Sequence, residues 1–278
     1  MKIVVLGAGG MLGHRMYLHL RSRFGHESVI GTVRDSHSPE IFFYDAGVVG
    51  FDPTSFVGLT WLKELRPDVI VNCIGIIKQR PQKPVESIEV NALLPHRLAE
   101  LVNGWGGRLI HFSTDCVFSG AKGDYREDSP TDARDLYGKT KAMGEVAWSS
   151  RAVTLRTSII GRELGGSRLS LLEWFLSQQS CKGYTTHFFS GVTTHHLAKV
   201  TGDIIEKHES LSGLFNLAGP SISKHDLLCE IRKAAKVEIG IYPERPDYCD
   251  RTLDGSRLAA ILGPTPSWPD MLEEVFRA

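Results

Sequence analysis

A glycine-rich turn near the N-terminus restricts the fold more than any other segment of this chain. The apolar run 2–6 has the composition of a buried strand, and the apolar residues of 11–24 recur with helical spacing. Between them stand three glycines at intervals of three residues: Gly7, Gly10 and Gly13. Glycine permits a tight turn, and it lets backbone N–H groups, here including those of Met11 and Leu12, approach a phosphate at a helix N-terminus. The segment therefore predicts a dinucleotide-binding turn.

The alternation of apolar runs and helical patterns continues through the first half of the chain. Further strands are predicted at 28–33, 48–51, 68–73, 108–112 and 152–157. Helices are predicted between them at 56–65, 85–102 and 135–148. Continuous Val and Ile runs separated by helices are typical of a parallel sheet covered on both faces. The predicted fold class is α/β, with a doubly wound parallel sheet of the Rossmann type.

The pattern loosens after Thr157. Helices are predicted near 170–179, 195–207, 224–235 and 269–276, with short strands at 214–217 and 237–241. We therefore expect a nucleotide-binding Rossmann domain over 1–158 and a smaller C-terminal α/β substrate lobe over 159–278, and we leave open whether the two are interleaved. Ligands of open α/β folds bind at the carboxyl edge of the sheet, beside which this lobe is expected to pack.

Composition excludes several classes of protein. Among 278 residues, 32 Lys and Arg balance 32 Asp and Glu, and no basic run marks a nucleic-acid-binding surface. No apolar stretch reaches the roughly 18 residues of a membrane span. The five cysteines are dispersed without a Cys-x-x-Cys pair, which is typical of reduced cytoplasmic thiols. We expect neither nucleic acid nor membrane as a partner, and no metal site, because His195 and His196 lack further ligands at suitable spacing.

The ends of the predicted strands supply candidate cofactor contacts. The second strand is followed by Arg34, whose guanidinium suits the 2′-phosphate of NADP(H). The next residue, Asp35, would instead suit the ribose hydroxyls of NAD, so this alternative stays open, with NADPH favoured. Asp52 follows the third strand and is a candidate adenine contact. Cys73 and Gly75 follow the fourth strand, where the chain is expected to pass the nicotinamide.

A hydroxyl residue and a Tyr/Lys pair predict the chemistry. Tyr137 and Lys141 are four residues apart on a predicted helix and therefore share one face. A neighbouring cation stabilises a phenolate, so Lys141 is expected to lower the pKa of Tyr137 towards the working pH and to hold the nicotinamide ribose. Thr114, at the end of the fifth strand, is expected to hydrogen-bond the substrate oxygen, with Ser113 as its competitor. The set predicts hydride transfer with Tyr137 as proton donor.

At these motifs the chain resembles the extended short-chain dehydrogenase/reductases, and among them the dTDP-4-dehydrorhamnose reductases. The resemblance is densest at 113–120 (STDCVFSG), 136–141 (LYGKTK) and 155–158 (LRTS). It implies catalytic roles for Thr114, Tyr137 and Lys141 and a position for Asp115 near the substrate.

Two departures from that family bear on the substrate and the metal. Cys116 stands where family members typically have Tyr, which leaves the sugar open. Arg15 stands where some members carry a Glu that helps to bind Mg²⁺ at a dimer contact, so no metal is carried over. Residues 72–78 and 189–194 resemble a branch proposed to act on UDP-linked 4-keto-6-deoxy amino sugars in polysaccharide assembly.

The sequence thus predicts NADPH-dependent reduction of the 4-keto group of a nucleotide-linked 6-deoxyhexose, linked to dTDP or UDP, for cell-surface polysaccharide. Ser113, Asp115 and Cys116 are expected at the sugar, and Arg156, Arg251 and Arg257 are candidates for its diphosphate because Arg forks match phosphate. A 4,6-dehydratase or 4-epimerase of the same superfamily is one alternative, and a non-catalytic NADP-sensing or subunit protein is another. The choice between a monomer and a homodimer stays open.

Overall fold

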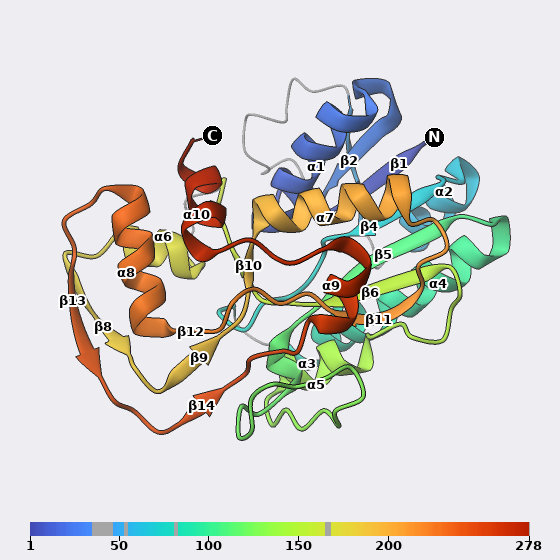
Figure 1. The fold of residues 1–278 in the computed structure, drawn as a ribbon. Helices are drawn as coiled ribbons and strands as arrows, with labels where there is room; N and C mark the ends of the chain where they lie inside the picture. Colours follow the sequence, from blue (N-terminus) through green and yellow to red (C-terminus); the bar gives the residue numbers. More distant parts are fainter. Residues whose placement is uncertain (35–46, 53–54, 81–82, 165–167, 278) are drawn as a thin grey trace.

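A parallel sheet forms the centre of the protein. The computed structural model describes residues 1–34, 47–52, 55–80, 83–164 and 168–277. Within these ranges seven strands lie in the order β11-β6-β5-β4-β1-β2-β3 (Figure 1). They are β1 (Ile3–Leu6), β2 (Val29–Val33), β3 (Val48–Gly50), β4 (Val69–Asn72), β5 (Arg108–Ser113), β6 (Ala152–Arg156) and β11 (Gly213–Asn216). The predicted fold class is confirmed.

Helices cover both faces of this sheet. The helices of the described chain are α1 (Met11–Phe24), α2 (Phe56–Leu65), α3 (Pro84–Ser87), α4 (Leu94–Trp105), α5 (Leu136–Met143), α6 (Leu171–Leu176), α7 (Thr194–Lys207), α8 (Lys224–Ala235), α9 (Ser256–Leu262) and α10 (Trp268–Arg277), of which α6 and α8 lie in the C-terminal part away from the sheet (Figure 1). Alternate residues of β1 pack on opposite faces of the sheet. Ile3 and Val5 pack into the core that α1 and α7 complete, whereas Val4 and Leu6 pack into the core of α2 and α4. This two-sided burial explains why the strands have continuous apolar sequences.

The predicted helix at 85–102 is interrupted. Between α3 and α4 the segment Ile88–Leu93 is a π-helix, η3. Its Asn91 side chain binds the loop after β4, accepting from Ile76 N at 2.8 Å and donating to Ile76 O at 3.0 Å. Gly144, directly after α5, lies so close to Asn91 that a Cβ there would be 1.9 Å from Asn91 O. The π-helix therefore packs against both the loop after β4 and the end of α5. Helix α5 ends at Met143, earlier than its predicted limit at 148.

The C-terminal part adds short pairings that the sequence did not predict. They involve β7 (Ile159–Ile160), β8 (Ser180–Tyr184), β9 (His187–Phe189), β10 (Val192–Thr193), β12 (Ile222–Ser223), β13 (Gly240–Glu244) and β14 (Cys249–Asp250). β10 pairs with β7, β13 with β8, and β9 lies between β12 and β14. Yet β11 joins the central sheet beside β6, and α7 packs in the same core as α1. The division expected at residue 158 therefore does not divide the sheet.

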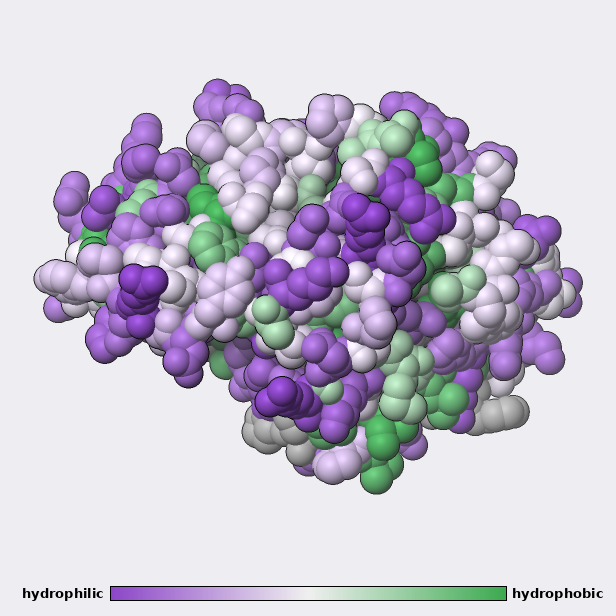
Figure 2. Space-filling model, turned by 60° about the horizontal axis from the view of Figure 1, so that its bottom comes forward, coloured by the Kyte–Doolittle hydropathy of each residue, from purple (hydrophilic) through white to green (hydrophobic). Residues whose placement is uncertain are grey.

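Hydrophilic and hydrophobic residues are interspersed on the face shown in Figure 2. Among the described residues, no helix has both the length and the apolar character needed to cross a bilayer.

Candidate active site

The glycine turn has the geometry that its sequence predicts. Gly7 follows β1 with φ of 83°, in the left-handed region, and its N–H donates to the Thr32 hydroxyl at 3.2 Å. A Cβ on Gly13 would lie 1.9 Å from Gly7 O, so only glycine allows α1 to begin so near the strand. No side chain caps α1 at Gly10. The N–H groups of its first turn, including Met11 and Leu12, therefore remain for an anionic ligand.

The second and third strands bring Arg34 and Asp52 to the same edge of the sheet as the turn. Arg34 directly follows β2, and its side chain is 64% exposed, with Glu86 Oε1 at 3.7 Å from Nη1. An exposed pair at this distance contributes little, so the guanidinium is accessible to a phosphate. Asp35, the alternative ribose contact, lies outside the described residues. Asp52 is exposed, and its backbone carbonyl accepts hydrogen bonds from Ser55 at the start of α2.

The loop after β4 lies against the glycine turn. Cys73 N donates to Leu6 O at 3.0 Å, and a Cβ on Gly7 would meet the Ile74 side chain at 3.0 Å. The Asn72 amide oxygen accepts from Ile74 N at 3.1 Å and so holds the loop. Burial raises the pKa of the Cys73 thiol, which keeps it uncharged. Gly75 is exposed farther along this loop, so both residues lie on the segment that packs beside the glycine turn.

Thr114 and Tyr137 meet where β5 ends and α5 begins. The Thr114 hydroxyl accepts from Cys116 N at 3.1 Å and donates to Asp115 Oδ1 at 3.2 Å, which starts a short 3-10 turn. A Cβ on Gly138 would lie 2.2 Å from Cys116 O, so α5 packs directly on this turn. The Tyr137 and Thr114 side chains are brought close enough to interact as a result.

The predicted lowering of the Tyr137 pKa by Lys141 is not what the structure shows, because burial has the larger effect. Burial raises the pKa of Tyr137 above its ordinary value, and the interaction with Thr114 opposes that change. The Lys141 ammonium instead donates to Phe112 O at 2.6 Å. Burial lowers the pKa of Lys141 to about 8, partly offset by the Glu145 carboxylate. Tyr137 therefore holds its proton firmly, as a proton donor must before reaction.

Two residues predicted at the substrate belong to a buried network instead. Arg156 ends β6 and binds Glu145 through two hydrogen bonds of 2.7 Å, and their side chains are only 4% and 8% exposed. The Ser113 hydroxyl donates to the same carboxylate at 2.7 Å. With their polar groups bound internally, Arg156 is not a diphosphate ligand and Ser113 is not a sugar ligand in this structure. Because Ser113 is bound to Glu145, Thr114 is the better candidate for the hydrogen bond to the substrate oxygen.

Arg251 does lie beside the catalytic residues. Its Nε donates to Phe118 O at 2.9 Å, and its charge acts on Cys116 and Asp135. A backbone hydrogen bond just before it, from Asp250 N to Gly120 O at 2.7 Å, fixes this segment on the loop that follows Thr114. Arg257 lies elsewhere, stacked 4.4 Å from the ring of Phe215 on β11. Of the late arginines, Arg251 therefore remains the candidate ligand.

The acidic and thiol side chains near Tyr137 are largely buried. Asp115 is 6% exposed. Burial raises the pKa of Cys116 to about 12, so the thiol is neutral beside the predicted sugar position. Lys224 also acts electrostatically on Asp115 and Cys116 from the C-terminal part, and no local pattern in the sequence predicts this.

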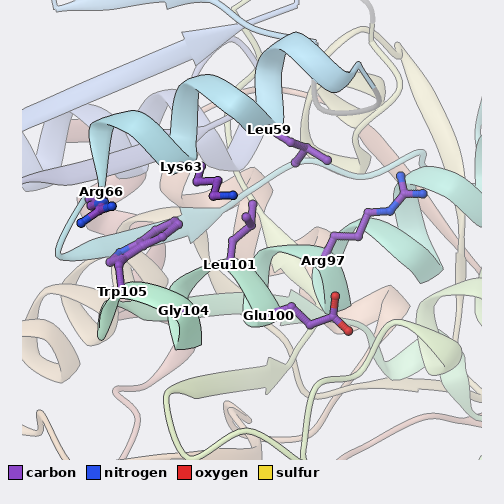
Figure 3. Close-up of a pocket in the computed structure, with 8 residues that line it drawn as sticks. All are labelled: Leu59, Lys63, Arg66, Arg97, Glu100, Leu101, Gly104 and Trp105. Carbon is purple, nitrogen blue, oxygen red and sulfur yellow. The ribbon is translucent and has the colours of Figure 1, made fainter.

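A groove of about 450 Å³ between α2 and α4 is separate from these residues (Figure 3). It is lined by Leu59, Lys63, Arg66, Arg97, Glu100, Leu101, Gly104 and Trp105. These residues lie along two crossover helices, and Lys63, Arg66, Gly104 and Trp105 lie at their C-terminal ends, towards the amino ends of the parallel strands. The candidate catalytic side chains lie at the carboxyl ends of the strands, so the groove is separate from the candidate active site.

The adjacent histidines of α7 do not form a metal centre. Burial lowers the pKa of His195 to about 4, so its ring is neutral at physiological pH. Across the described ranges, no group of three or more His, Cys, Asp or Glu side chains is arranged to hold a metal ion.

The chain matches a known protein family over almost its whole length. The family model described as RmlD substrate binding domain matches residues 1–274. The chain belongs to this family. The resemblance noted at residues 113–120, 136–141 and 155–158 is thereby confirmed over nearly the whole length.

Similar proteins include methionine adenosyltransferase subunits and dTDP-4-dehydrorhamnose reductases. Methionine adenosyltransferase 2 subunit beta of Xenopus tropicalis is 25% identical over 249 residues, covering 84% of this chain and 72% of that protein. A dTDP-4-dehydrorhamnose reductase of Salmonella typhimurium is 29% identical over 189 residues, covering 62% and 63%. The structure of the dTDP-4-dehydrorhamnose reductase of Bacillus anthracis, in complex with NADP, matches with a TM-score of 0.79 at 19% identity, covering 99% and 98%. The last likeness shows the shared fold.

Proposed function

We propose that this protein reduces the 4-keto group of a nucleotide-linked 6-deoxyhexose with NADPH. The observation that carries the proposal is the meeting of Thr114, Tyr137 and Lys141 at the carboxyl edge of the sheet that also bears the uncapped glycine turn. The names of the dTDP-4-dehydrorhamnose reductases among the relatives support the same activity.

The residues of the chain divide the chemistry between them. NADPH, when bound, supplies the hydride. Tyr137 donates the proton to the carbonyl oxygen, and its raised pKa keeps the phenol protonated until charge develops on that oxygen. Thr114 interacts with Tyr137 and stands next to the same oxygen. Lys141 remains within the buried site as a cation that stabilises the phenolate after transfer.

The binding roles follow from position along the same edge. The turn of Gly7, Gly10 and Gly13 binds the pyrophosphate, and Arg34 selects NADPH through the 2′-phosphate. Asp52 lies towards the adenine, and Cys73 and Gly75 lie towards the nicotinamide. In this proposal residues 1–158 supply most cofactor contacts, and residues 159–278 supply much of the sugar pocket.

The sugar lies beside Asp115 and Cys116, with Arg251 at its diphosphate. The short thiol of Cys116 leaves more room than a Tyr would, which favours a bulkier substituent such as the N-acetyl group of a UDP-linked sugar. The dTDP-linked rhamnose precursor is the rival substrate. We place the reaction in the cytoplasm, in the supply of sugars for cell-surface polysaccharide, with a homodimer as the candidate assembly.

A non-catalytic role is the second candidate, because the relative from Xenopus tropicalis is named a subunit of methionine adenosyltransferase. The presence of Thr114, Tyr137 and Lys141 in one site favours catalysis over this role. A 4,6-dehydratase is disfavoured because Cys116, rather than Glu, follows Asp115. A 4-epimerase is disfavoured by Arg34.

The test is oxidation of NADPH by the purified protein with 4-keto-6-deoxy sugars linked to dTDP or to UDP, each made in place by its dehydratase. We expect one of the two to be reduced, and the unactivated keto sugar to react poorly because remote binding positions the reacting carbon. If neither nucleotide sugar is reduced, or if the free keto sugar reacts equally well, the proposal is wrong.

A further inference from the structure

One lysine of the C-terminal part is placed unlike the others there. Lys224 is the first residue of α8 and follows β12, which pairs with β9. On its other side β9 pairs with β14, the strand that leads into Arg251. Figure 1 shows these short strands between α8 and the main sheet. The small sheet thus carries Lys224 towards the loop after Thr114.

The Lys224 ammonium is half-buried and lies among the substrate-side residues. Its Nζ is 3.7 Å from the centre of the Phe189 ring. Its charge interacts with Asp115, Cys116 and Arg251. Burial lowers the pKa of Lys224 to about 8. Within the part of the chain that the structure describes, its Nζ has no hydrogen-bond or ion-pair partner.

Other lysines of this region show the usual arrangement. Lys182 on β8 binds Glu244 at 2.6 Å, and Lys233 on α8 binds Glu230 at 2.7 Å. Both side chains are more than two-thirds exposed, at 69% and 67%. Lys224 differs because its half-buried ammonium lies against an aromatic ring and not against a carboxylate. A ligand that brings an acceptor there gains hydrogen bonds that the protein leaves unmade.

The charges around Lys224 restrict which kind of ligand atom can accept its hydrogen bonds. An ammonium donates only, so its partner must carry a lone pair. The Asp115 carboxylate already neutralises this region and would repel a second anion such as the diphosphate. Arg251, held to Phe118 O, presents the better fork for phosphate. A neutral oxygen fits the remaining position.

We propose that Lys224 binds a neutral oxygen on the sugar ring, a hydroxyl or an amide carbonyl near the reacting carbon, and so determines which sugar is accepted. This inference rests on the proposed function, because it names a contact within the same substrate site. Lys224 acts on binding of the sugar, whereas Tyr137 and Thr114 act on the carbonyl that reacts.

The experiment compares Lys224→Met and Lys224→Gln with Lys233→Met, a control from the exposed face of the same helix. For Lys224→Met we expect KM for the nucleotide sugar to rise about 10- to 100-fold, the effect of one charged hydrogen bond. The Kd for NADPH and the kcat at saturation should change little, and Lys224→Gln should fall between. In the wild type, KM should rise as the pH passes about 8; because Lys141 titrates in the same range, the part of this rise that Lys224→Met removes is the part that belongs to Lys224.

Calorimetric titration of UDP-N-acetylglucosamine and dTDP-glucose into the NADP-bound protein separates this inference from the proposed function. If the wild type reduces a keto sugar but Lys224→Met keeps its KM and pH profile, the inference is overturned. Equal losses for NADPH and sugar would also overturn it, because they indicate a purely structural role. If the wild type reduces no sugar yet binds one in a Lys224-dependent way, the inference stands and the reductase proposal fails. Absence of both turnover and binding overturns both.

Discussion

Replacing Arg156 distinguishes a buried structural arginine from a diphosphate ligand. Arg156→Met keeps most of the side-chain volume but leaves the Glu145 carboxylate without its two 2.7 Å hydrogen bonds. The Arg156 guanidinium also donates to Glu127 O at 3.1 Å and Arg126 O at 3.3 Å, and both carbonyls lose that partner. We therefore expect a large loss of stability and no selective loss of sugar binding.

The size of the effect follows from burial. Removing one partner of a buried ion pair costs roughly 3–5 kcal/mol because the other charge stays unpaired. For a chain of this size, each kcal/mol lowers Tm by about 2–4 °C, so Arg156→Met should melt about 6–20 °C below the wild type. Combining Glu145→Met with Arg156→Met removes both charges and should recover part of that loss.

Scanning calorimetry of Arg156→Met and of the double variant measures these melting temperatures. Arg277→Met is the matched control, since Arg277 is 74% exposed and pairs with Glu273 on the surface of α10. It should change stability by less than about 1 kcal/mol. The reasoning is refuted if Arg156→Met melts with the wild type while KM for the nucleotide sugar rises.

Three further changes probe the cofactor and catalytic residues. Tyr137→Phe removes the proton donor, so turnover should fall roughly 10²–10⁴-fold while the Kd for NADPH holds; near-normal turnover would contradict the assignment. Arg34→Ala should weaken NADPH binding by about one to two powers of ten and leave NADH nearly unaffected in fluorescence titrations, whereas equal losses would favour Asp35 as the ribose contact. Gly13→Ala places a Cβ 1.9 Å from Gly7 O, so it should lower both Tm and NADPH affinity, and a variant with wild-type values for both would show that the turn adapts.

The central sheet was predictable because each strand carries its own signal. In the run Val69–Asn72, for example, the first three residues are apolar and all four are buried, since both faces of the sheet are covered. The two-residue strands were not predictable. The pairing of Ile222–Ser223 with His187–Phe189 depends on segments more than thirty residues apart, and two residues carry no period.

The candidate catalytic residues Tyr137 and Lys141 were predictable from their spacing in the sequence. The charged side chains that interact near them were not. Tyr137 and Lys141 share a helix face by the geometry of the helix alone. Nothing local shows that Glu145 meets Arg156, because the end of α5 must first pack beside β6. Lys224 was missed for the same reason: its neighbours come from β9, β14 and the loop after β5.

The late arrival of β11 has a consequence for synthesis of the chain. β6 emerges from the ribosome as an unpaired strand edge, and its partner Gly213–Asn216 is made more than fifty residues later. At ~5–20 residues per second this delay lasts on the order of 3–11 s. Over that interval the nascent sheet also lacks α7, which covers the apolar face it shares with α1. Exposed strand edges pair readily with other chains, so the newborn protein should depend on chaperone binding until its last third is complete.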